Sequence, residues 1–444
     1  MPRCCALTLP LVLLLQFAPA TRAEDWPQWR GPRGDGSSGS RGLPVRWSKT
    51  ENLRWRLPLP GPAGATPALW GDRLFLTSAE GSDIVLLAIS TEGKTLWQKK
   101  LGTGNRKVRG DEGNSASPSP STDGKHVWSF TGLGDLSCHD FEGREVWSVD
   151  LKERHGAYRI QFGMTSTPVL FGDALYLQCI HSGESYILSV DKKTGADRWK
   201  KARITDARDE CEHSYASPIL YRDDQRTLLL AHGADYLTAH RLEDGAEVWR
   251  CGALNPPEKY NNTLRFVASP VAAPGLVIIP SAKNGPVYAV RPDGSGDVTL
   301  SHRVWMRERD TPDVPTPAIH DGLVYLLREN GVLICHDLKT GKQLYLERTH
   351  AQRHRASPVV ADGKVYCAAA DGTVTVVQAG REFKVLATNS IDEHLSATPI
   401  AAEGRLYLRS YDALYAIEPP KQSVDGSTAP GGARAGGEAA AGGR

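Results

Sequence analysis

A short phrase of Ser or Thr followed by Pro recurs along the sequence, almost always before an alternating apolar segment. The copies read ATPAL, ASPSP, STPVL, ASPIL, ASPVA, PTPAI, ASPVV and ATPIA. Their prolines are Pro67, Pro118, Pro168, Pro218, Pro270, Pro317, Pro358 and Pro399. The spacing of 41 to 52 residues is typical of propeller blades. One unit, repeated eight times, therefore accounts for most of the chain.

Each unit has the pattern of four short strands. In the third unit these are TPVLFG, DALYLQCI, SYILSVDKK and TGADRWKK, separated by turn signals at Gly172-Asp173 and Thr194-Gly195. Such a sheet cannot bury both faces alone, whereas neighbouring sheets around an axis bury each other. The sequence predicts an all-β fold over residues 42–418, an eight-bladed β-propeller of four-stranded antiparallel blades.

A second recurring phrase, complete as DKKTGADRW at 191–199, is expected at the hairpin between the third and fourth strands of each blade. Its Gly supplies a turn conformation that side chains resist. The aromatic residue after the turn is expected to cover the interface with a neighbouring blade, which stabilises the fold by about 2–3 kcal/mol per buried ring. These docking residues are Trp55, Trp97, Trp147, Trp199, Trp249, Trp305 and Tyr345.

The last unit, which begins near Pro399, ends after three strands. The segment ENLRWRLPLPG at 51–61 precedes the first unit and belongs to no blade, yet it carries Trp55 where the other units carry their aromatic residue. We expect this N-terminal strand to pair with the last blade and close the ring.

The two ends of the chain differ from the repeats. Residues 1–23 have the basic start, short apolar run and small-residue cleavage site of a signal peptide. The mature protein is therefore expected to be periplasmic or otherwise extracytoplasmic. Residues 24–41 are expected to pack on the propeller, with Trp26 and Trp29 on its outside. The Gly/Ala-rich residues 419–444 are predicted to be disordered.

Charge and cysteine content restrict the possible partners. The 53 Lys and Arg residues nearly balance 51 Asp and Glu, so nucleic acid is not an expected partner. No later apolar stretch is long enough for a transmembrane helix, and a monomeric propeller is expected. Cys211 and Cys251 flank one repeat and are candidates for a disulfide; buried free thiols are the alternative.

The phrase at Asp191–Trp199 resembles the tryptophan-docking motif of pyrroloquinoline quinone (PQQ)-like repeat propellers, and the opening DWPQWRGP is similar to the lead-in of exported bacterial members. The resemblance covers about residues 42–418 and implies an eight-bladed propeller. It implies two kinds of function. Some members are PQQ-dependent quinoprotein dehydrogenases, and others bind no cofactor, such as the propeller lipoprotein of the outer-membrane β-barrel assembly machinery.

Most of the residues that the dehydrogenases would require are not found in this sequence. Many of these enzymes carry a vicinal disulfide beside the quinone, but here adjacent cysteines occur only as Cys4-Cys5 in the expected signal peptide. No calcium-binding motif of that family maps onto the chain. His350 and His354, with residues 392–394 in the next loop, could hold a metal, but solvated loop side chains are the preferred interpretation. No catalytic residue, cofactor or metal is therefore expected, with PQQ and Ca²⁺ kept as the alternative.

Long polar loops precede the Ser/Thr-Pro phrases, and in a propeller these loops surround one mouth of the central channel. They could bind a carboxylate, a sugar acid or an acidic peptide, or they could hold the blades together by ion pairs. Candidate binding residues are Arg109, Arg159, His213, Tyr215, Arg265, Asp313, Arg355 and His394.

The sequence thus predicts an exported, non-catalytic binding or scaffold module for a protein or an envelope polymer. The alternatives are a PQQ-dependent oxidoreductase or another enzyme of the propeller mouth, acting on alcohols or sugars, and a sensor of a small anionic metabolite.

Overall fold

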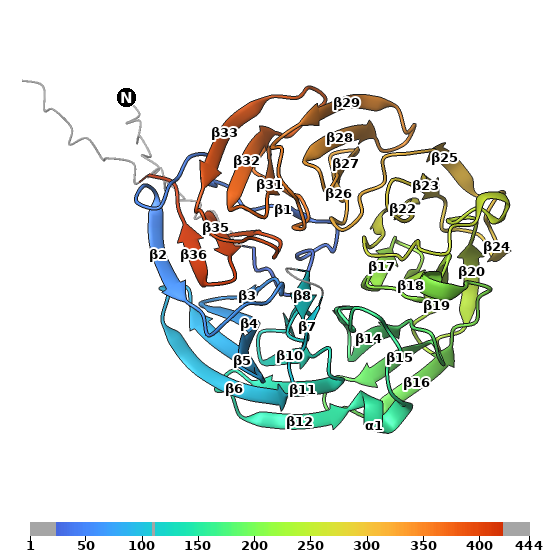
Figure 1. Ribbon diagram of the computed structural model, residues 1–444, viewed down its shortest axis with the longest axis horizontal. Coiled ribbons are helices and arrows are strands. Elements are labelled where there is room, and N and C mark those ends of the chain that lie inside the picture. The colour runs from blue at the N-terminus through green and yellow to red at the C-terminus, as the bar shows by residue number, and fades with distance from the viewer. Residues whose placement is uncertain (1–23, 109–111, 421–444) are drawn as a thin grey trace, which may run out of the picture.

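The computed structural model of the protein describes residues 24–108 and 112–420. Within these residues, eight blades surround a central axis (Figure 1). In each blade the neighbouring strands are antiparallel, and the chain passes from the innermost strand to the outermost in seven of them. The predicted all-β eight-bladed propeller is therefore confirmed. The predicted signal peptide, residues 1–23, and most of the predicted tail lie outside the described residues.

The first four blades are built as follows. Blade one contains β3 (Ala68–Trp70), β4 (Arg73–Glu80), β5 (Asp83–Ser90) and β6 (Thr95–Thr103). Blade two contains β9 (Ser121–Thr122), β10 (His126–Phe130), β11 (Asp135–Asp140) and β12 (Glu145–Asp150). Blade three contains β13 (Val169–Phe171), β14 (Ala174–Cys179), β15 (Tyr186–Asp191) and β16 (Asp197–Ala202). Blade four contains β17 (Ile219–Arg222), β18 (Thr227–Gly233), β19 (Tyr236–Arg241) and β20 (Glu247–Cys251).

The remaining blades follow the same plan. Blade five contains β21 (Val271–Ala273), β22 (Leu276–Pro280), β23 (Val287–Val290) and β25 (Arg303–Arg307). Blade six contains β26 (Ala318–His320), β27 (Leu323–Leu327), β28 (Val332–Asp337) and β29 (Gln343–Arg348). Blade seven contains β30 (Val359–Ala361), β31 (Lys364–Ala368), β32 (Thr373–Gln378) and β33 (Val385–Ser390). Blade eight contains β34 (Ile400–Ala402), β35 (Arg405–Arg409), β36 (Ala413–Ile417) and β2 (Leu53–Pro58).

A few short elements lie outside this plan. Two short strands add to blades in parallel: β1 (Ser37–Ser38) pairs with β30 and β24 (Gly296–Asp297) pairs with β20. A hairpin of β7 (Lys107–Val108) and β8 (Gly113–Asn114) extends towards the central axis (Figure 1). In the part of the chain that the structure describes, the helical elements are α1 (Leu151–His155) and two 3₁₀ turns, η1 (Asp209–Glu212) and η2 (Pro257–Lys259).

The ring is closed by strand β2 from the N-terminal part of the chain. It pairs antiparallel with β36, and Arg56 lies opposite Tyr415. In Figure 1 this strand, in blue, forms the outer edge of the red C-terminal blade. The predicted closure is therefore confirmed. A closed ring leaves no blade interface without a partner, which is why the segment before the first repeat carries its own docking tryptophan.

The Ser/Thr residues of the Ser/Thr-Pro phrases form a ring at the start of the innermost strands, and among the described residues hydrogen bonds join seven of its eight neighbouring pairs. The backbone N–H of one such residue donates to the hydroxyl of the next, as from Thr167 to Ser217 at 2.9 Å. Among the described residues this chain of bonds runs, at 2.8 to 3.2 Å, through Thr66, Ser119, Thr167, Ser217, Ser269, Thr316, Ser357 and Thr398. A hydroxyl is required because the N–H groups it accepts from are buried.

This ring corrects the repeat marker in the second blade. The sequence pattern predicts the marker at Pro118, but the ring uses Ser119 and therefore Pro120. The motif ASPSP contains two equivalent Ser-Pro pairs, and the sequence offers no local reason to prefer the second. Strand β9 begins directly after Pro120, so strand pairing selects it.

The tryptophans at the docking positions contact the following blade. Each indole N–H donates to a backbone carbonyl of the following blade, as from Trp147 to Lys192 at 3.0 Å and from Trp199 to Leu242 at 2.8 Å. Trp55, Trp97, Trp249 and Trp305 make the same kind of bond. Tyr345 packs its ring on Phe383 of the next blade instead, with 5.5 Å between ring centroids. The six tryptophan interfaces therefore combine ring packing with one directed hydrogen bond.

The segment that precedes β2 crosses the opposite end of the channel. Trp26 exchanges backbone hydrogen bonds with Leu69 on an innermost strand, and its side chain has no exposed surface. Arg30 is also buried and donates to the carbonyls of Pro317 at 2.7 Å and Pro358 at 3.3 Å, in blades six and seven. The expectation that Trp26 lies on the outside is therefore wrong: this segment ties several blades together across the axis.

The cysteines that the structure describes are all buried free thiols, so Cys211 and Cys251 do not form the disulfide considered from the sequence. Within residues 24–108 and 112–420, no helix is long and apolar enough to cross a membrane.

Candidate functional site

A cavity of about 190 Å³ occupies the central channel. Its wall includes the Ser/Thr ring, for example Thr167 and Ser217, because these residues start the innermost strands. Trp29, from the segment that crosses the opposite end, also lines it. The loops that lead into the innermost strands contribute the ionisable groups, so the mouth of the channel on this side is the candidate site.

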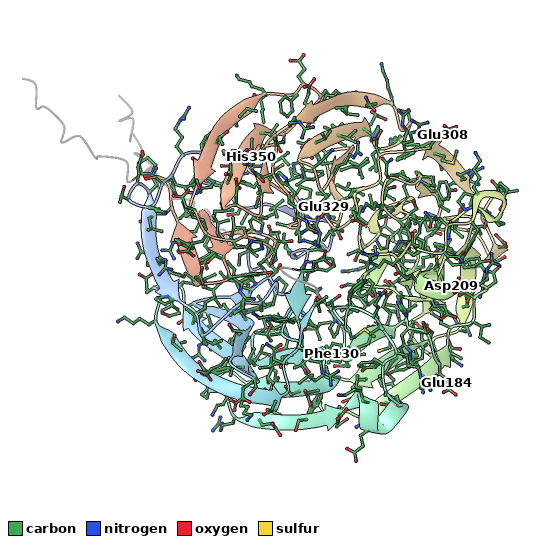
Figure 2. The ribbon with its side chains drawn as sticks, viewed as in Figure 1. Phe130, Glu184, Asp209, Glu308, Glu329 and His350 are labelled. Atoms are coloured by element: carbon green, nitrogen blue, oxygen red, sulfur yellow. The ribbon has the colours of Figure 1, made fainter. Side chains whose placement is uncertain are left out.

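An ion-pair network connects loops across this mouth. Glu112, next to β8, accepts from Arg355 at 2.8 Å and from Arg353 at 3.1 Å. Glu329 also binds Arg353, at 2.7 Å, and lies 3.7 Å from Arg355. Figure 2 shows Glu329 close to the central axis. Because Glu112 comes from the loop between blades one and two and both arginines come from the loop between blades six and seven, the network bridges the mouth.

Two carboxyl groups of the site have pKa values that move apart. Burial, reinforced by the neighbouring charge of Glu329, raises the pKa of Asp313. Burial alone would also raise the pKa of Glu329. The hydrogen bond from Arg353 and the charges of Arg355 and Arg353 outweigh burial and hold the pKa of Glu329 below its usual range. Asp313 is therefore the group of this pair that takes up a proton first, and its carboxyl then donates a hydrogen bond.

A second cluster lines the same cavity. Arg265 lies 3.4 Å from Glu210 and stacks over the ring of Phe162, with 4.8 Å from Cζ to the ring centroid. The Tyr215 hydroxyl accepts from the backbone N–H of Phe162 at 3.2 Å. Burial raises the pKa of Tyr215 to about 12, so this hydroxyl stays neutral. Of the predicted site residues, the structure thus brings Tyr215, Arg265, Asp313 and Arg355 together in one cavity.

The other predicted residues lie elsewhere. His213 is buried and forms a 2.7 Å hydrogen bond with Ser182, and the His394 ring packs on Tyr411 with 4.3 Å between centroids. Arg159 is exposed and is not part of the cavity wall. Arg109 lies outside the described residues. The predicted convergence of Arg109 with Arg159 stays a prediction.

The acids of the site are not among the residues predicted from the sequence. Glu112 and Glu329 pair with Arg355, and Glu210 pairs with Arg265; both arginines were predicted as anion ligands. Acidic residues are visible in the same loops, as in RGDEG and RDECEH, but which acid meets which arginine depends on blade neighbours far apart in the sequence.

A wider groove of about 600 Å³ adjoins the mouth and shares Asp313 with it. Four basic and two acidic side chains line the groove, together with three amides. Its polar wall consists of Lys283, Asn284, Thr311, Asp313, Arg328, Glu329, Asn330, Arg348, Gln352 and Arg353. Lys283 and Arg348 are exposed and, among the described residues, neither forms an ion pair. The groove therefore keeps a basic excess that the mouth itself lacks.

The side chains do not gather as a metal or quinone site would require. The described residues contain no group of three His, Cys, Asp or Glu side chains that could hold a metal ion. His350 instead pairs with Asp371 at 2.8 Å, and the buried His354 bonds to the Gln352 carbonyl at 2.9 Å. PQQ carries three carboxylates, which need unpaired cations, whereas the arginines of the mouth are already paired with acids. The residues present do not fit this cofactor.

Comparison with known proteins agrees with the fold. The structure is similar to the crystal structure of BamB from Moraxella catarrhalis, with a TM-score of 0.59 and 15% identity, covering 82% of this chain and 99% of that one. It is also similar to a europium-containing methanol dehydrogenase (TM-score 0.68, 12% identity, covering 88% and 90% of the two chains). A quinohemoprotein alcohol dehydrogenase from Comamonas testosteroni matches with a TM-score of 0.65 and 14% identity over 88% and 80%.

At these identities the structural likenesses establish the fold alone. No curated protein sequence matches the chain. A family model described as outer membrane protein assembly factor BamB matches residues 82–345 and 302–382, which together span more than half of the sequence. The repeats, the docking tryptophans and this match agree, and the chain belongs to that family of PQQ-like propellers.

Proposed function

We propose that the protein is an exported, non-catalytic binding module that holds an acidic segment of a protein or envelope polymer in the groove beside the channel mouth. The observation that carries this proposal is the basic excess of the groove, where Lys283 and Arg348 are exposed and form no ion pair with the described residues. Basic side chains placed among amides suit an extended acidic chain, which offers carboxylates to the cations and backbone groups to Asn284 and Asn330.

The pairing of charges at the mouth supports a binding role over catalysis. A side chain that acts as a general acid or base must direct its own proton-donating or proton-accepting atom at the substrate. Glu112 and Glu329 are instead bound to the arginines of the mouth, Arg353 and Arg355. The network instead fixes the loops that border the groove. A rigid border reduces the ordering cost of association, because fewer side chains lose freedom when the partner binds.

The proposal is tested by fluorescence anisotropy with a labelled poly-glutamate peptide as the probe. Reversing two exposed charges of the groove with Lys283→Glu and Arg348→Glu should weaken binding by about tenfold or more, since like charges then face the probe. The matched control is Lys339→Glu with Lys342→Glu, two exposed lysines at the turn between β28 and β29. This control should bind as the unchanged protein does.

Equal loss of binding in both double variants would indicate a non-specific charge effect and contradict the groove as the site. Calorimetric titration of PQQ, with and without Ca²⁺, tests the alternative function. Saturable, Ca²⁺-dependent binding of PQQ would contradict a module without a cofactor and would favour a quinoprotein oxidoreductase.

A further inference from the structure

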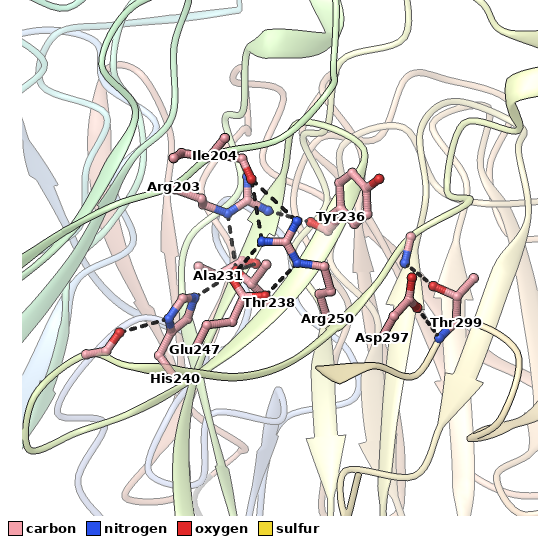
Figure 3. A network of polar contacts seen from close by, with 12 residues as sticks. Arg203, Ile204, Ala231, Tyr236, Thr238, His240, Glu247, Arg250, Asp297 and Thr299 are labelled. Carbon is pink, nitrogen blue, oxygen red and sulfur yellow. Dashed lines mark hydrogen bonds and ion pairs between the residues drawn. The ribbon is translucent and has the colours of Figure 1, made fainter. Parts of the chain in front are cut away.

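A basic side chain can hold an anion from outside the protein only if it is accessible and is not already paired. Two arginines of blade four do not meet this condition (Figure 3). Arg203 is only 5% exposed and donates to Thr238 Oγ1 at 3.2 Å and to the Tyr236 carbonyl at 2.8 Å. Arg250 is paired with Glu247 at 2.5 Å. Both side chains therefore stabilise the blade and offer no anion site.

A cavity of about 530 Å³ beside blades one to three does meet the condition. It lies between the β7–β8 hairpin and residues 157–164, which lead into blade three, and we call it the hairpin groove. Its charged lining residues are Arg106, Lys107 and Lys152, and no acidic side chain of the described residues lines it. Arg106 and Lys107 are exposed, and within residues 24–108 and 112–420 none of the three cations forms an ion pair. The hairpin groove therefore has a net positive charge.

Two carboxylates, Asp150 and Asp135, lie near the hairpin groove without lining it. Asp150 Oδ1 accepts from the backbone N–H groups of Lys152 at 2.7 Å and Glu153 at 3.2 Å. Asp135 Oδ2 accepts from the Thr131 hydroxyl at 2.8 Å. Because Asp150 lies beside Lys152, it weakens the positive potential there more than at the hairpin. Most of the attraction for an anion therefore comes from the two hairpin cations.

The rest of the wall of the hairpin groove is largely apolar. Its apolar and aromatic lining residues are Val108, Leu133, Tyr158, Ile160, Phe162 and Met164. Apolar surface beside the cations keeps water away and strengthens charge pairing. A polypeptide can offer carboxylates to the cations and an apolar side chain to this wall, whereas a polyuronate offers only hydroxyl and carboxylate groups. The wall therefore favours an acidic polypeptide.

The hairpin groove is continuous with the basic groove of the proposed function through the channel mouth. It shares Val108 and Phe162 with the central cavity, which in turn shares Asp313 with the basic groove. Blades one to three lie across the central axis from blades five to seven (Figure 1). An extended chain that leaves one groove can therefore reach the other across the mouth.

The charges between the two grooves nearly cancel. The ion-pair network of the mouth joins two acids to two arginines, and Glu210 is paired with Arg265. Burial raises the pKa of Asp313, which favours its neutral form. An acidic chain that crosses here therefore meets little net charge.

The same network fixes the two grooves relative to each other. Glu112, next to β8, binds Arg355 at 2.8 Å, so the β7–β8 hairpin is held against the loop between blades six and seven. That loop also contributes Gln352 and Arg353 to the basic groove. Because both grooves are held in place, binding in both requires mainly the ordering of the incoming chain.

We propose that the acidic partner segment is a polypeptide that crosses the channel mouth, with one run of carboxylates in the basic groove and a second run on Arg106, Lys107 and Lys152. This inference rests on the proposed function, because the first run is the segment proposed there. Two linked contacts raise the effective concentration of the second contact, so a chain that spans both grooves binds more tightly than a chain that fills one.

The test is a titration of the protein with oligoglutamates of six and twenty residues, followed by calorimetry and by fluorescence anisotropy. Fully extended, these chains reach at most about 20 Å and about 70 Å. One twenty-residue chain should bind per protein molecule, at least about tenfold more tightly than the six-residue chain. Up to two six-residue chains should bind per molecule, because each fills only one groove.

Variants locate the second contact. Arg106→Glu with Lys107→Glu should weaken the twenty-residue chain by about tenfold, to the affinity of the six-residue chain, and Lys152→Gln should weaken it by about threefold. The matched control is again Lys339→Glu with Lys342→Glu, which should bind as the unchanged protein does. Because Arg106 and Lys107 are exposed, their double variant should keep the melting temperature of the unchanged protein.

The outcomes separate this inference from the proposed function. Undiminished binding of the twenty-residue chain after Arg106→Glu with Lys107→Glu, or two such chains per molecule, overturns the crossing. The proposed function then stands if Lys283→Glu with Arg348→Glu still weakens binding. Binding that is lost in the first double variant but unchanged in the second contradicts the proposed function and the crossing together. Tighter binding of polygalacturonate of matched charge would overturn the assignment to a polypeptide.

Discussion

The ring of Trp147 lies directly on the hairpin glycine of the next blade, Gly195. A Cβ atom at position 195 would lie 2.6 Å from Trp147 Cε3, closer than real Cβ contacts allow. Gly195 also has a φ of +72°. The Gly and Trp of the recurring phrase are therefore complementary halves of an interface. Gly93, Gly143, Gly245 and Gly341 lie in the same way against a tryptophan of the blade before them.

This contact predicts that Gly195→Ala lowers the free energy of unfolding by about 2–5 kcal/mol, from backbone strain and overpacking together. Gly172→Ala is the matched control, because Gly172 also has a positive φ, +57°, but no atom lies within 4 Å of its Cβ position. It should cost only about 1 kcal/mol. Chemical denaturation measures both. Equal costs would contradict the close approach of Trp147.

The hydroxyl ring predicts a cost for Ser217→Ala. Removing this hydroxyl leaves the buried N–H of Thr167 without its acceptor, so we expect a loss of about 1–3 kcal/mol in unfolding free energy. Ser396→Ala is the control, since Ser396 lines the same cavity and its hydroxyl has no hydrogen-bond partner among the described residues. A cost for Ser396→Ala as large as that for Ser217→Ala would show that the ring bonds are not responsible.

Ring closure predicts the effect of deleting residues 42–60. The deletion removes β2 and Trp55, exposes the edge of β36 and leaves one blade interface uncovered. The melting temperature should fall by on the order of 10 °C in calorimetry. The exposed Glu51→Ala at the start of this segment should melt as the unchanged protein does. A deletion with an unchanged melt would be incompatible with this closure.

Stability should depend on pH through Asp235. Burial raises the pKa of Asp235 to about 6, although Tyr260 donates to its Oδ2 at 2.6 Å. In the unfolded chain the Asp235 carboxyl ionises near pH 4. Between about pH 4 and 6 this carboxyl therefore binds more protons in the folded state than in the unfolded state. The stabilising contribution of Asp235 to the free energy of unfolding is therefore fully present below pH 4 and is lost as the pH rises through 6.

Asp235→Asn should reduce the change in unfolding free energy between pH 4 and pH 7. The difference in unfolding free energy, variant minus original, should therefore be about 1–3 kcal/mol more favourable to the variant at pH 7 than at pH 4. Unfolding curves at both pH values measure the effect. The same pH dependence in the variant and the original would assign it to other groups.

Residues of the repeat could be interpreted from the sequence because their roles are local or strictly periodic. Trp199 and Gly195 occupy fixed positions in a hairpin, and β2 was identified because the last unit lacked a strand. Ser119 could not be distinguished from the earlier Ser-Pro pair, because only strand pairing on β9 separates them. Trp26 was placed wrongly because its burial depends on an innermost strand of the first blade.

The site, too, was predictable from the sequence only in part. Its loops and its Arg355, Asp313, Arg265 and Tyr215 were predicted, but the acids that neutralise the arginines were not. The sequence alone determined the eight repeats, the blade interfaces and the face on which the long loops gather, because alternating side chains, turns and docking rings act within a blade or on its neighbour. The tertiary structure decided which charges pair, which cations stay unpaired and what crosses the channel. Those outcomes depend on groups more than 200 residues apart, such as Glu112 and Arg355, which only the closed ring brings within 2.8 Å.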